Sequence, residues 1–424
     1  MMGDFFKETD VVCIGLGPFN LSLSVLLHEA GFENYIAIEQ KESFSWHEGM
    51  LLEGTTLQVP FLADLSTMVN PRSEFTYLNY LHEKNRLQKF FFFEDFKVPR
   101  REYNNYCQWA CEKIKEKIIF DCAAISIKET KTGFAIQTSK GKIYTRKIVI
   151  GIGTVPYTPE CVKQNKNIIH SSDFYKNQCK IKKNANITIL GSGQSSAEIF
   201  KFLFNEQMEN GKKKYFLNWL TRSQGLFQME YSKFGLEFSS LDHTKFFYHG
   251  HGDKKKLVKS QAFIYKGISY STISDIYNAL YHRDINNDID NYVLIHPFLD
   301  LIEIEQKNNI IMKFKNTRTE QNKTILTDYL ICCTGYKYEI PAFLDKLKNK
   351  IKLTDKETID LDFNYKVKYN GDGTIYVQNM EINTHGLTSP DLGYGAIRAS
   401  IIANDIIGKH YYIEQKNNIF QNFD

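Results

Sequence analysis

Two strand–glycine–helix segments, one at the start of the chain and one near its middle, restrict the fold more than any other feature. In the first, residues 10–15 (DVVCIG) predict a buried strand, because apolar and β-branched residues follow one another. A glycine turn then leads into a predicted helix at residues 21–29, and a second strand, residues 35–39 (YIAIE), ends at Glu39. This order predicts a βαβ unit that binds a dinucleotide.

The chemistry of this first unit follows from the backbone of its turn. Gly15 and Gly17 leave room for a pyrophosphate to approach, and the helix N-terminus supplies free N–H groups and the positive end of its dipole. Glu39 stands about 20 residues further on and can accept a hydrogen bond from a ribose hydroxyl. Asn20 occupies the position where the pattern usually has its third glycine, so the match is incomplete.

The second segment repeats this arrangement in the middle of the chain. Residues 187–190 (ITIL) predict a strand, residues 191–198 (GSGQSSAE) a glycine turn and helix start, and residues 215–220 (YFLNWL) the following strand. That strand ends at Arg222, flanked by Thr221 and Ser223, where an NAD site would present an acid. An arginine suits a ribose 2′-phosphate, so the sequence favours NADP over NAD.

Two such units predict an α/β protein with two Rossmann-like dinucleotide-binding domains, the first for FAD and the second for NADPH. A stretch without Rossmann character predicts a small, mainly helical substrate domain. We expect the chain to leave and re-enter the first domain through strands near residues 147–153 and 328–335. The predicted boundaries are 1–180 and 326–424 for the FAD domain, 181–226 and 284–325 for the NADPH domain, and 227–283 for the substrate domain.

Composition narrows the function further. A formal charge of +4 is too small to indicate nucleic acid or an anionic membrane as a partner, and no apolar stretch is long enough to span a bilayer. The first ten residues, MMGDFFKETD, do not resemble a signal peptide, so the eight cysteines predict reduced thiols in the cytoplasm. None of them forms CxxC or a zinc-finger spacing, which argues against a disulfide reductase and against a metal site.

Several stretches, taken together and in order, resemble the microbial N-hydroxylating flavin monooxygenases, which act on lysine, ornithine or diamines in hydroxamate siderophore synthesis. A family pattern, D-x3-L/F-A-T-G-Y, is met from Asp328 to Tyr336 but departs at Cys332 and Cys333, where apolar residues and Ala are usual. The matching stretches are residues 15–22, 44–47 (FSWH), 57–64 (LQVPFLAD), 70–81 (NPRSEFTYLNYL), 100–106, 191–198, 281–283 (YHR), 333–336 and 384–387 (THGL).

The resemblance implies an FAD- and NADPH-dependent enzyme that uses O2 to hydroxylate a primary amine through a C4a-hydroperoxyflavin, without a protein nucleophile. It also implies a homo-oligomer, commonly a tetramer. The residues it assigns to FAD are Gly15, Gly17, Pro18, Phe19, Asn20, Glu39, Trp46, His47, Gln58 and Leu387. The residues it assigns to NADPH are Gly191, Ser192, Gly193, Gln194, Ser195, Ser196 and Arg222.

The residues themselves give separate information on two of the positions that the resemblance places at the flavin. Gln58 lies between apolar Leu57 and Val59, so its burial would be costly without a partner such as the flavin. Trp46 can equally be a core residue.

The substrate is predicted from Ala63. Family members that act on amino acids usually have Lys at this position, where it binds the substrate α-carboxylate, and Ala63 cannot do so. Residues 229–237 and 265–269 resemble the diamine-hydroxylating branch, which places Lys266 and Ser269 near the substrate. A diamine needs an acid for its distal ammonium, and Glu230 and Glu237 are candidates, although both can also be surface carboxylates. We therefore expect cadaverine or putrescine as the substrate.

Other functions remain open. Lys233, Lys266 or Arg72 could bind a carboxylate instead, which would make L-lysine or L-ornithine the substrate. A flavin monooxygenase acting on sulfur or a ketone has the same layout, but it would carry an F-x-G-x3-H signature, of which only the end, from His170 to Phe174, is present. A flavin-binding protein without catalysis would not need an intact second glycine turn.

Overall fold

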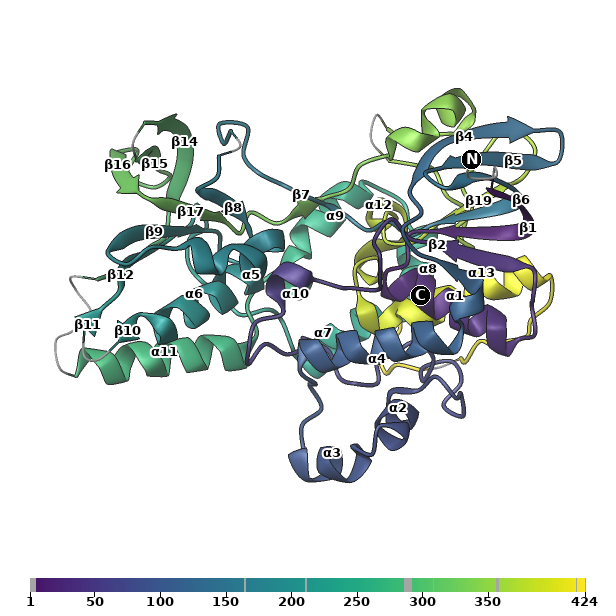
Figure 1. The fold of residues 1–424 in the computed structure, drawn as a ribbon, viewed down its shortest axis with the longest axis horizontal. Helices are drawn as coiled ribbons and strands as arrows, with labels where there is room; N and C mark the ends of the chain where they lie inside the picture. Colours follow the sequence, from purple (N-terminus) through teal and green to yellow (C-terminus); the bar gives the residue numbers. More distant parts are fainter. Residues whose placement is uncertain are drawn as a thin grey trace.

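Two sheets with parallel cores divide the computed structural model into two lobes (Figure 1). The structure describes residues 5–163, 165–209, 212–285, 292–307, 309–355, 358–416 and 418–423. Both chain ends belong to the first lobe, and the middle of the chain forms the second. This confirms an α/β fold with two Rossmann-like units.

The first sheet has the strand order β3-β2-β1-β6-β5-β4, and β19 also pairs with β6. Side chains of β1 alternate between two apolar clusters: Val11 and Cys13 face one, and Val12 and Ile14 face the other. Both faces are therefore buried, as the continuous apolar run predicts. The strands are β1 (Phe5–Ile14), β2 (Tyr35–Ile38), β3 (Ile118–Ile119), β4 (Ala124–Thr130), β5 (Gly133–Thr138), β6 (Gly141–Ile150) and β19 (Thr374–Val377).

Helices cover both faces of this sheet. On one face α1 packs between α13 and α4, and on the other the 3₁₀ segment η6 lies against β4. Helices α2 and α3 project from this lobe (Figure 1). The bounds are α1 (Pro18–Glu29), α2 (Tyr77–Glu83), α3 (Leu87–Phe93), α4 (Arg100–Lys113), α12 (Ile382–His385), α13 (Gly395–Ile407), η1 (Glu48–Met50), η2 (Lys115–Lys117), η6 (Ala342–Lys350), η7 (Gly386–Thr388) and η8 (Leu392–Tyr394).

The second sheet is parallel throughout, in the order β13-β12-β9-β17-β8. Helices α6 and α11 pack together in this lobe, and the meander β14-β15-β16 shares an apolar cluster with the sheet. The elements are β8 (Ile168–His170), β9 (Ala185–Leu190), β10 (Met208–Glu209), β11 (Lys212–Lys213), β12 (Tyr215–Leu220), β13 (Val293–His296), β14 (Leu299–Gln306), β15 (Ile310–Asn316), β16 (Asn322–Thr327), β17 (Tyr329–Cys332), α5 (Phe174–Asn177), α6 (Gln194–Glu206), α11 (Tyr270–Asp284), η3 (Ser171–Asp173) and η4 (Gln178–Lys180).

The crossing between the lobes differs from the expected boundaries. Strands β8 and β17, which the boundaries 180 and 326 assign to the first domain, pair with each other in the second sheet, where β17 also pairs with β9. The chain instead crosses at an antiparallel pair, β7 (Val155–Pro156) and β18 (Tyr336–Lys337). A buried apolar strand such as β17 carries no sequence mark of which parallel sheet it joins, so the pattern identified the strand but not its sheet.

The predicted substrate domain, residues 227–283, is helical but does not stand apart. Its helices α8 and α9 pack on α12 of the first lobe, whereas α11 packs on α6 of the second. The insert therefore bridges the two lobes beside the crossing (Figure 1). Its elements before α11 are α7 (Lys233–Leu236), η5 (Glu237–Ser239), α8 (Leu241–His249), α9 (Lys254–Ser260) and α10 (Ala262–Tyr265).

In the described part of the chain, no helix is both long and apolar enough to cross a membrane. All eight cysteines are free thiols.

Candidate active site

The first glycine turn joins β1 to α1 and has the geometry of a nucleotide-binding turn. Gly15 adopts a φ of +83°, and a Cβ there would lie 2.9 Å from the carbonyl oxygen of Gly151, so no other residue fits without strain. Gly17 caps α1 and Pro18 begins it. The Glu39 carboxylate accepts a hydrogen bond of 2.7 Å from the Leu16 N–H, which places the acid at the end of β2 directly beside the turn.

Asn20 acts differently from the expectation that it holds a pyrophosphate. Its side chain is fully buried, and its amide donates to the Gly15 carbonyl at 2.7 Å and accepts from the Gln378 amide at 2.7 Å. A Cβ on Gly151 would lie 2.5 Å from the Asn20 amide carbon. The side chain therefore joins β1, β6 and the chain after β19 behind the turn, and only the backbone of Asn20 remains on the ligand side.

One cavity of about 330 Å³ lies between the lobes and the insert. Four residues expected at the flavin, Trp46, His47, Gln58 and Leu387, line it from the first lobe. Gln194 and Ser195 line it from the second lobe, at the start of α6. Residues predicted to contact two different cofactors thus share one cavity, whose volume is in the range of ligand-binding pockets.

His47 is held neutral in this cavity. His47 keeps an exposed surface at the cavity, but desolvation by the surrounding protein atoms and the positive charges of Arg100 and Lys41 lower its pKa to about 3. Its ring lies edge-on to Trp46, with the ring centres 4.3 Å apart, and Trp46 in turn packs on Tyr103. These rings form an uncharged aromatic wall, which suits a flat, apolar ring system.

The second glycine turn joins β9 to α6. A Cβ on Gly191 would lie 2.2 Å from the Cys333 carbonyl oxygen, and Gly193 caps α6. Ser192 and Ser223 share a hydrogen bond of 2.8 Å, which links the turn to the loop after β12 that carries Arg222. Ser196 is buried and donates to the Gly193 carbonyl, so its hydroxyl supports the turn from inside.

Lys266 lies near Arg222 rather than in the cavity. Desolvation by neighbouring protein atoms and the positive charge of Arg222 lower the pKa of Lys266, which remains exposed and does not line the cavity. Ser269 is also outside the cavity: its N–H donates to Gln194 and its hydroxyl pairs with Thr272 at the start of α11. The structure therefore moves both residues from the expected substrate site to the side of the second glycine turn.

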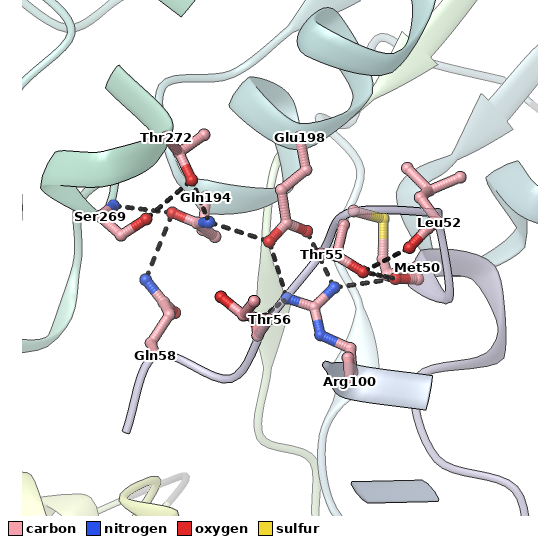
Figure 2. Close-up of polar contacts among 10 residues, drawn as sticks. All are labelled: Met50, Leu52, Thr55, Thr56, Gln58, Arg100, Gln194, Glu198, Ser269 and Thr272. Atoms are coloured by element: carbon pink, nitrogen blue, oxygen red, sulfur yellow. Dashed lines mark hydrogen bonds and ion pairs between the residues drawn. The ribbon is translucent and has the colours of Figure 1, made fainter. Parts of the chain in front are cut away.

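A buried network ties the two lobes together at the cavity floor (Figure 2). The Arg100 guanidinium from α4 donates to both carboxylate oxygens of Glu198 on α6, each at 2.8 Å, and also to the Met50 carbonyl. The Gln194 amide donates to Glu198 at 2.9 Å, and its oxygen accepts from the Gln58 amide at 3.4 Å. Gln58 thus has the polar partner that its apolar neighbours required.

The sequence predicts no role for Arg100 or Glu198. Both lie within stretches that resemble the family, residues 100–106 and 191–198. The resemblance therefore points to the two stretches, but it does not predict that the two side chains form a pair. A salt bridge between residues 98 positions apart leaves no local pattern, because it depends on how the lobes meet.

Two acidic residues, Glu230 and Asp391, line the cavity. Glu230 accepts hydrogen bonds from Ser232, which lower its pKa. Asp391, which the sequence argument missed, accepts from the Gly393 N–H at 2.8 Å, and burial raises its pKa. Burial, together with the charge of Asp391, also raises the pKa of the Tyr231 phenol to about 12.

Asp391 has a weak signal in the sequence. The stretch THGL, which resembles the family, ends four residues before Asp391, so the acid lies just beyond a stretch that the sequence singles out.

Two further residues expected at the substrate lie elsewhere. The Glu237 carboxylate accepts hydrogen bonds from the backbone N–H groups of Phe420 and Gln421, at 2.9 and 3.0 Å, and does not line the cavity. Ala63 is buried and also lies outside the cavity lining. Among the described residues, no cluster of three or more His, Cys, Asp and Glu side chains is arranged to hold a metal ion.

Two dinucleotide-binding turns on separate lobes, with one cavity between them, define a two-dinucleotide oxidoreductase. A sequence model of the L-lysine 6-monooxygenase/L-ornithine 5-monooxygenase family matches residues 7–338. The chain therefore belongs to this family of flavin-dependent amine monooxygenases.

Individual relatives agree with this assignment. The chain is 37% identical over 422 residues to a putrescine N-hydroxylase from Acinetobacter baumannii, covering 98% of this chain and 93% of the relative. The crystal structure of the FAD-bound cadaverine monooxygenase of the desferrioxamine pathway of Erwinia amylovora is similar, with a TM-score of 0.92, 31% identity and 99% of each chain covered. An ornithine N-hydroxylase from Kutzneria, solved with reduced FAD, NADP+ and L-ornithine, has a TM-score of 0.88 at 26% identity, with 95% of this chain and 99% of that one covered.

Proposed function

We propose that this protein hydroxylates one terminal amine of a diamine, putrescine or cadaverine, with FAD, NADPH and O2, and so supplies an N-hydroxy-diamine for hydroxamate siderophore synthesis. The observation that carries the choice of substrate is the charge of the cavity. Among the described residues that line it, Glu230 and Asp391 are acidic, whereas Arg100 is held by Glu198 and His47 is neutral. A distal ammonium finds an acid there, and an α-carboxylate finds no free cation.

The residues present fit both cofactors. The glycine turn with Glu39 suits the pyrophosphate and ribose of FAD, and the uncharged wall of Trp46 and His47 suits its ring system. The turn at Gly191, with Arg222 and Lys266 close together, suits NADPH, because two cations favour a 2′-phosphate. When bound and reduced by NADPH, FAD supplies the activation of O2 for transfer of one oxygen atom to nitrogen.

The protein's own part is to bind the amine, orient it and control its proton. Asp391 holds the distal ammonium, so that the other amine points towards the wall formed by Trp46, Gln58 and Leu387. That amine must be neutral to react, and a free alkyl ammonium has a pKa of about 10.4. Its transfer into a largely apolar cavity lowers that pKa and favours the neutral form. Residues of the insert line the cavity on one side and limit the access of water to the reaction.

We place the enzyme in the cytoplasm, where NADPH is supplied and cysteine thiols stay reduced. The family resemblance suggests that it forms a homo-oligomer, commonly a tetramer. Size-exclusion chromatography with light scattering tests the assembly.

The first test is product formation, because NADPH consumption alone also reports peroxide release. Purified protein with FAD and NADPH is assayed for hydroxylamine with putrescine, cadaverine, L-lysine and L-ornithine. We expect product with the diamines and little or none with the amino acids. Product with L-lysine alone would keep the family and overturn the diamine proposal.

The second test separates the role of Asp391 from general damage to the cavity. In Asp391→Asn we expect KM for putrescine to rise by about tenfold or more, because a charge-assisted hydrogen bond contributes about 1.5–3 kcal/mol. Butylamine, which lacks the distal ammonium, serves as the matched substrate and should bind the variant and the wild type equally. Equal losses with both amines would show that Asp391 does not recognise the distal ammonium.

The pH dependence of kcat/KM tests the role of Asp391 in the wild-type enzyme. Asp391 binds an ammonium only when ionised, and its pKa is raised by burial. The advantage of putrescine over butylamine in kcat/KM should therefore be complete above that raised pKa and disappear as the pH falls through it. In Asp391→Asn the ratio of the two values should not change with pH.

A further inference from the structure

The carboxylate of Glu237 binds the chain itself rather than facing the cavity. Residues 418–423, here called the strap, return from the end of the first lobe to the insert. The Phe420 and Gln421 N–H groups donate to Glu237, and the Gln421 side chain donates to the Phe234 carbonyl at 2.8 Å and to Glu237 at 3.1 Å. Figure 1 shows the yellow end of the chain lying in the region of α7 and α8.

An aromatic contact adds to these hydrogen bonds. The Phe423 ring packs on His243 and Phe238, with ring centres 5.0 and 5.4 Å apart, and on Phe246 at 5.9 Å. His243 is buried, and burial lowers its pKa to about 4, so its ring is neutral and packs as an aromatic residue. Phe420, by contrast, is 95% exposed. The strap is thus anchored by its backbone at one position and by a ring at another.

The chain before the strap is also fixed. The Tyr412 hydroxyl donates to the Leu26 carbonyl on α1 at 2.6 Å, and Tyr412 exchanges backbone hydrogen bonds of 2.8 and 2.9 Å with the Asn404 side chain. Glu414 forms an ion pair with Lys245 on α8. The approach to the strap therefore links α1 and α13 to the insert.

The segment that the strap holds is the outer wall of the proposed amine site. Gly235, Leu236 and Ser239 line the cavity, and they belong to the short elements α7 and η5. A helix of four residues is not stable by itself, so its position depends on outside contacts. Within the described residues, residues 233–238 form their hydrogen bonds to distant parts of the chain with the strap, and Ser239, at the end of the segment, bonds the Asp391 carboxylate.

A second cavity, of about 820 Å³, lies between this wall, α13 and the approach to the strap. Leu236 and Ser239 line both cavities, so the wall between them is one layer of chain. Movement of residues 233–239 away from their present position would therefore open the amine site into the larger space, and the strap opposes this movement.

We propose that the strap positions the wall of the amine site, with Glu237 as a positioning residue, and thereby sets the affinity for the amine. This inference rests on the proposed function, because it takes the 330 Å³ cavity as the amine site. The strap should affect amine binding but not the cofactors. The described contacts at the Gly15 and Gly191 turns do not include the strap, so NADPH binding and flavin reduction do not depend on the strap.

The test compares a variant lacking residues 418–424 with Glu237→Ala and Phe423→Ala. Phe420→Ala is the matched control, because it removes a phenylalanine from the same strap without removing a contact. We expect KM for putrescine to rise by about tenfold in the deletion and by about threefold to tenfold in the two point variants, as loss of one to two hydrogen bonds or a ring contact predicts. KM for NADPH, the rate of flavin reduction and FAD content should stay within twofold, and Phe420→Ala should match the wild type.

Several outcomes would overturn the inference. An unchanged KM for putrescine in all three variants would show that the strap does not position the wall, even if thermal stability falls. A parallel loss of flavin reduction and amine binding would show a general structural role. If the deletion does not fold, the two point variants carry the test.

Failure of the inference can be told apart from failure of the proposed function. A wild type that hydroxylates no amine refutes the function. Hydrogen–deuterium exchange still reports on the strap in that case, since Glu237→Ala should speed exchange in residues 233–239 while leaving residues 191–198 unchanged. Unchanged exchange in both segments would overturn the inference without any assay of activity.

Discussion

The two glycine turns have similar sequences and different surroundings. The turn at Gly15 is braced from within its own lobe: Glu39 bonds its backbone, Asn20 fills the space behind it, and Gln378 holds Asn20. The turn at Gly191 begins α6, and the polar side chains of that helix, Gln194 and Glu198, reach across to the first lobe. One turn is part of a core, and the other is part of an interface.

This difference fits the two ligands that we propose. A cofactor that stays bound through many turnovers suits a turn that is rigid before binding, because no ordering free energy is then lost on binding. A cosubstrate that must arrive and leave suits a turn at the boundary of two lobes, where contacts such as Gln58 to Gln194 can adjust. The comparison can be tested by removing the bracing of each turn separately.

The largest effect is expected at the interface. Glu198→Ala leaves the Arg100 guanidinium buried without its partner, and loss of one member of a buried ion pair costs about 3–5 kcal/mol. We expect the free energy of unfolding in urea to fall by about this amount. Glu206→Ala, on the same helix but exposed, is the control and should change it by less than about 0.5 kcal/mol.

A double variant sharpens this result. Arg100→Met with Glu198→Leu removes both charges, and an apolar pair of similar volume often replaces a buried ion pair without loss. Recovery of most of the stability would show that the charges orient the lobes rather than hold the fold. If Glu198→Ala alone is as stable as the wild type, the interface is not braced by this pair.

A smaller effect is expected at the first turn. Asn20→Gly restores the glycine that the dinucleotide pattern usually has, yet it leaves the Gln378 amide with only its longer hydrogen bond to the Phe19 carbonyl, at 3.3 Å, and opens a space beside Gly151. We expect a loss of about 2–3 kcal/mol in the free energy of unfolding, together with release of FAD on gel filtration.

The control for this change is Asn278→Gly, on the exposed side of α11. It carries only the cost of glycine in a helix, about 0.5–1 kcal/mol. Equal losses in the two variants would mean that Asn20 does not brace the turn, and the contrast between the two glycine turns would then fail.

Much of the fold could be predicted from the sequence, because its signals are local. Strands β9 and β12 and the second half of β1 are mainly apolar runs. Strands β1 and β9 lead directly into glycine turns, whose positions are fixed by close backbone approach at Gly15 and Gly191. Strand β17 shows the limit: its residues predict a buried strand but not the sheet that it joins. The helical insert was recognised by the absence of Rossmann pattern, but its division between two lobes depends on packing.

The site divides in the same way. Trp46, His47, Gln58 and Leu387, which the family resemblance assigns to the flavin, line one cavity, and each could be singled out because it lies within a conspicuous local stretch. Glu237 was predicted from its charge, but a carboxylate is satisfied by whatever N–H groups the fold brings to it, here those of Phe420 and Gln421. Sequence position gives no information about a partner more than 180 residues away.

The smallest effects are expected beside the second glycine turn, where we place the 2′-phosphate of NADPH. Two cationic side chains in different surroundings can be compared there. Arg222 lies two residues after the end of β12, and Lys266 lies close enough for the charge of Arg222 to lower its pKa. In Arg222→Ala we expect KM for NADPH to rise by about tenfold to a hundredfold, because a guanidinium bonds a phosphate in a charge-assisted, two-point manner. In Lys266→Ala, which removes an exposed charge, the rise should be only about twofold to fivefold.

NADH, which lacks the 2′-phosphate, is the internal control, and its KM should change little in either variant. A rise for NADH equal to that for NADPH would place both residues in support of the turn itself, which would make the second turn braced in the same manner as the first.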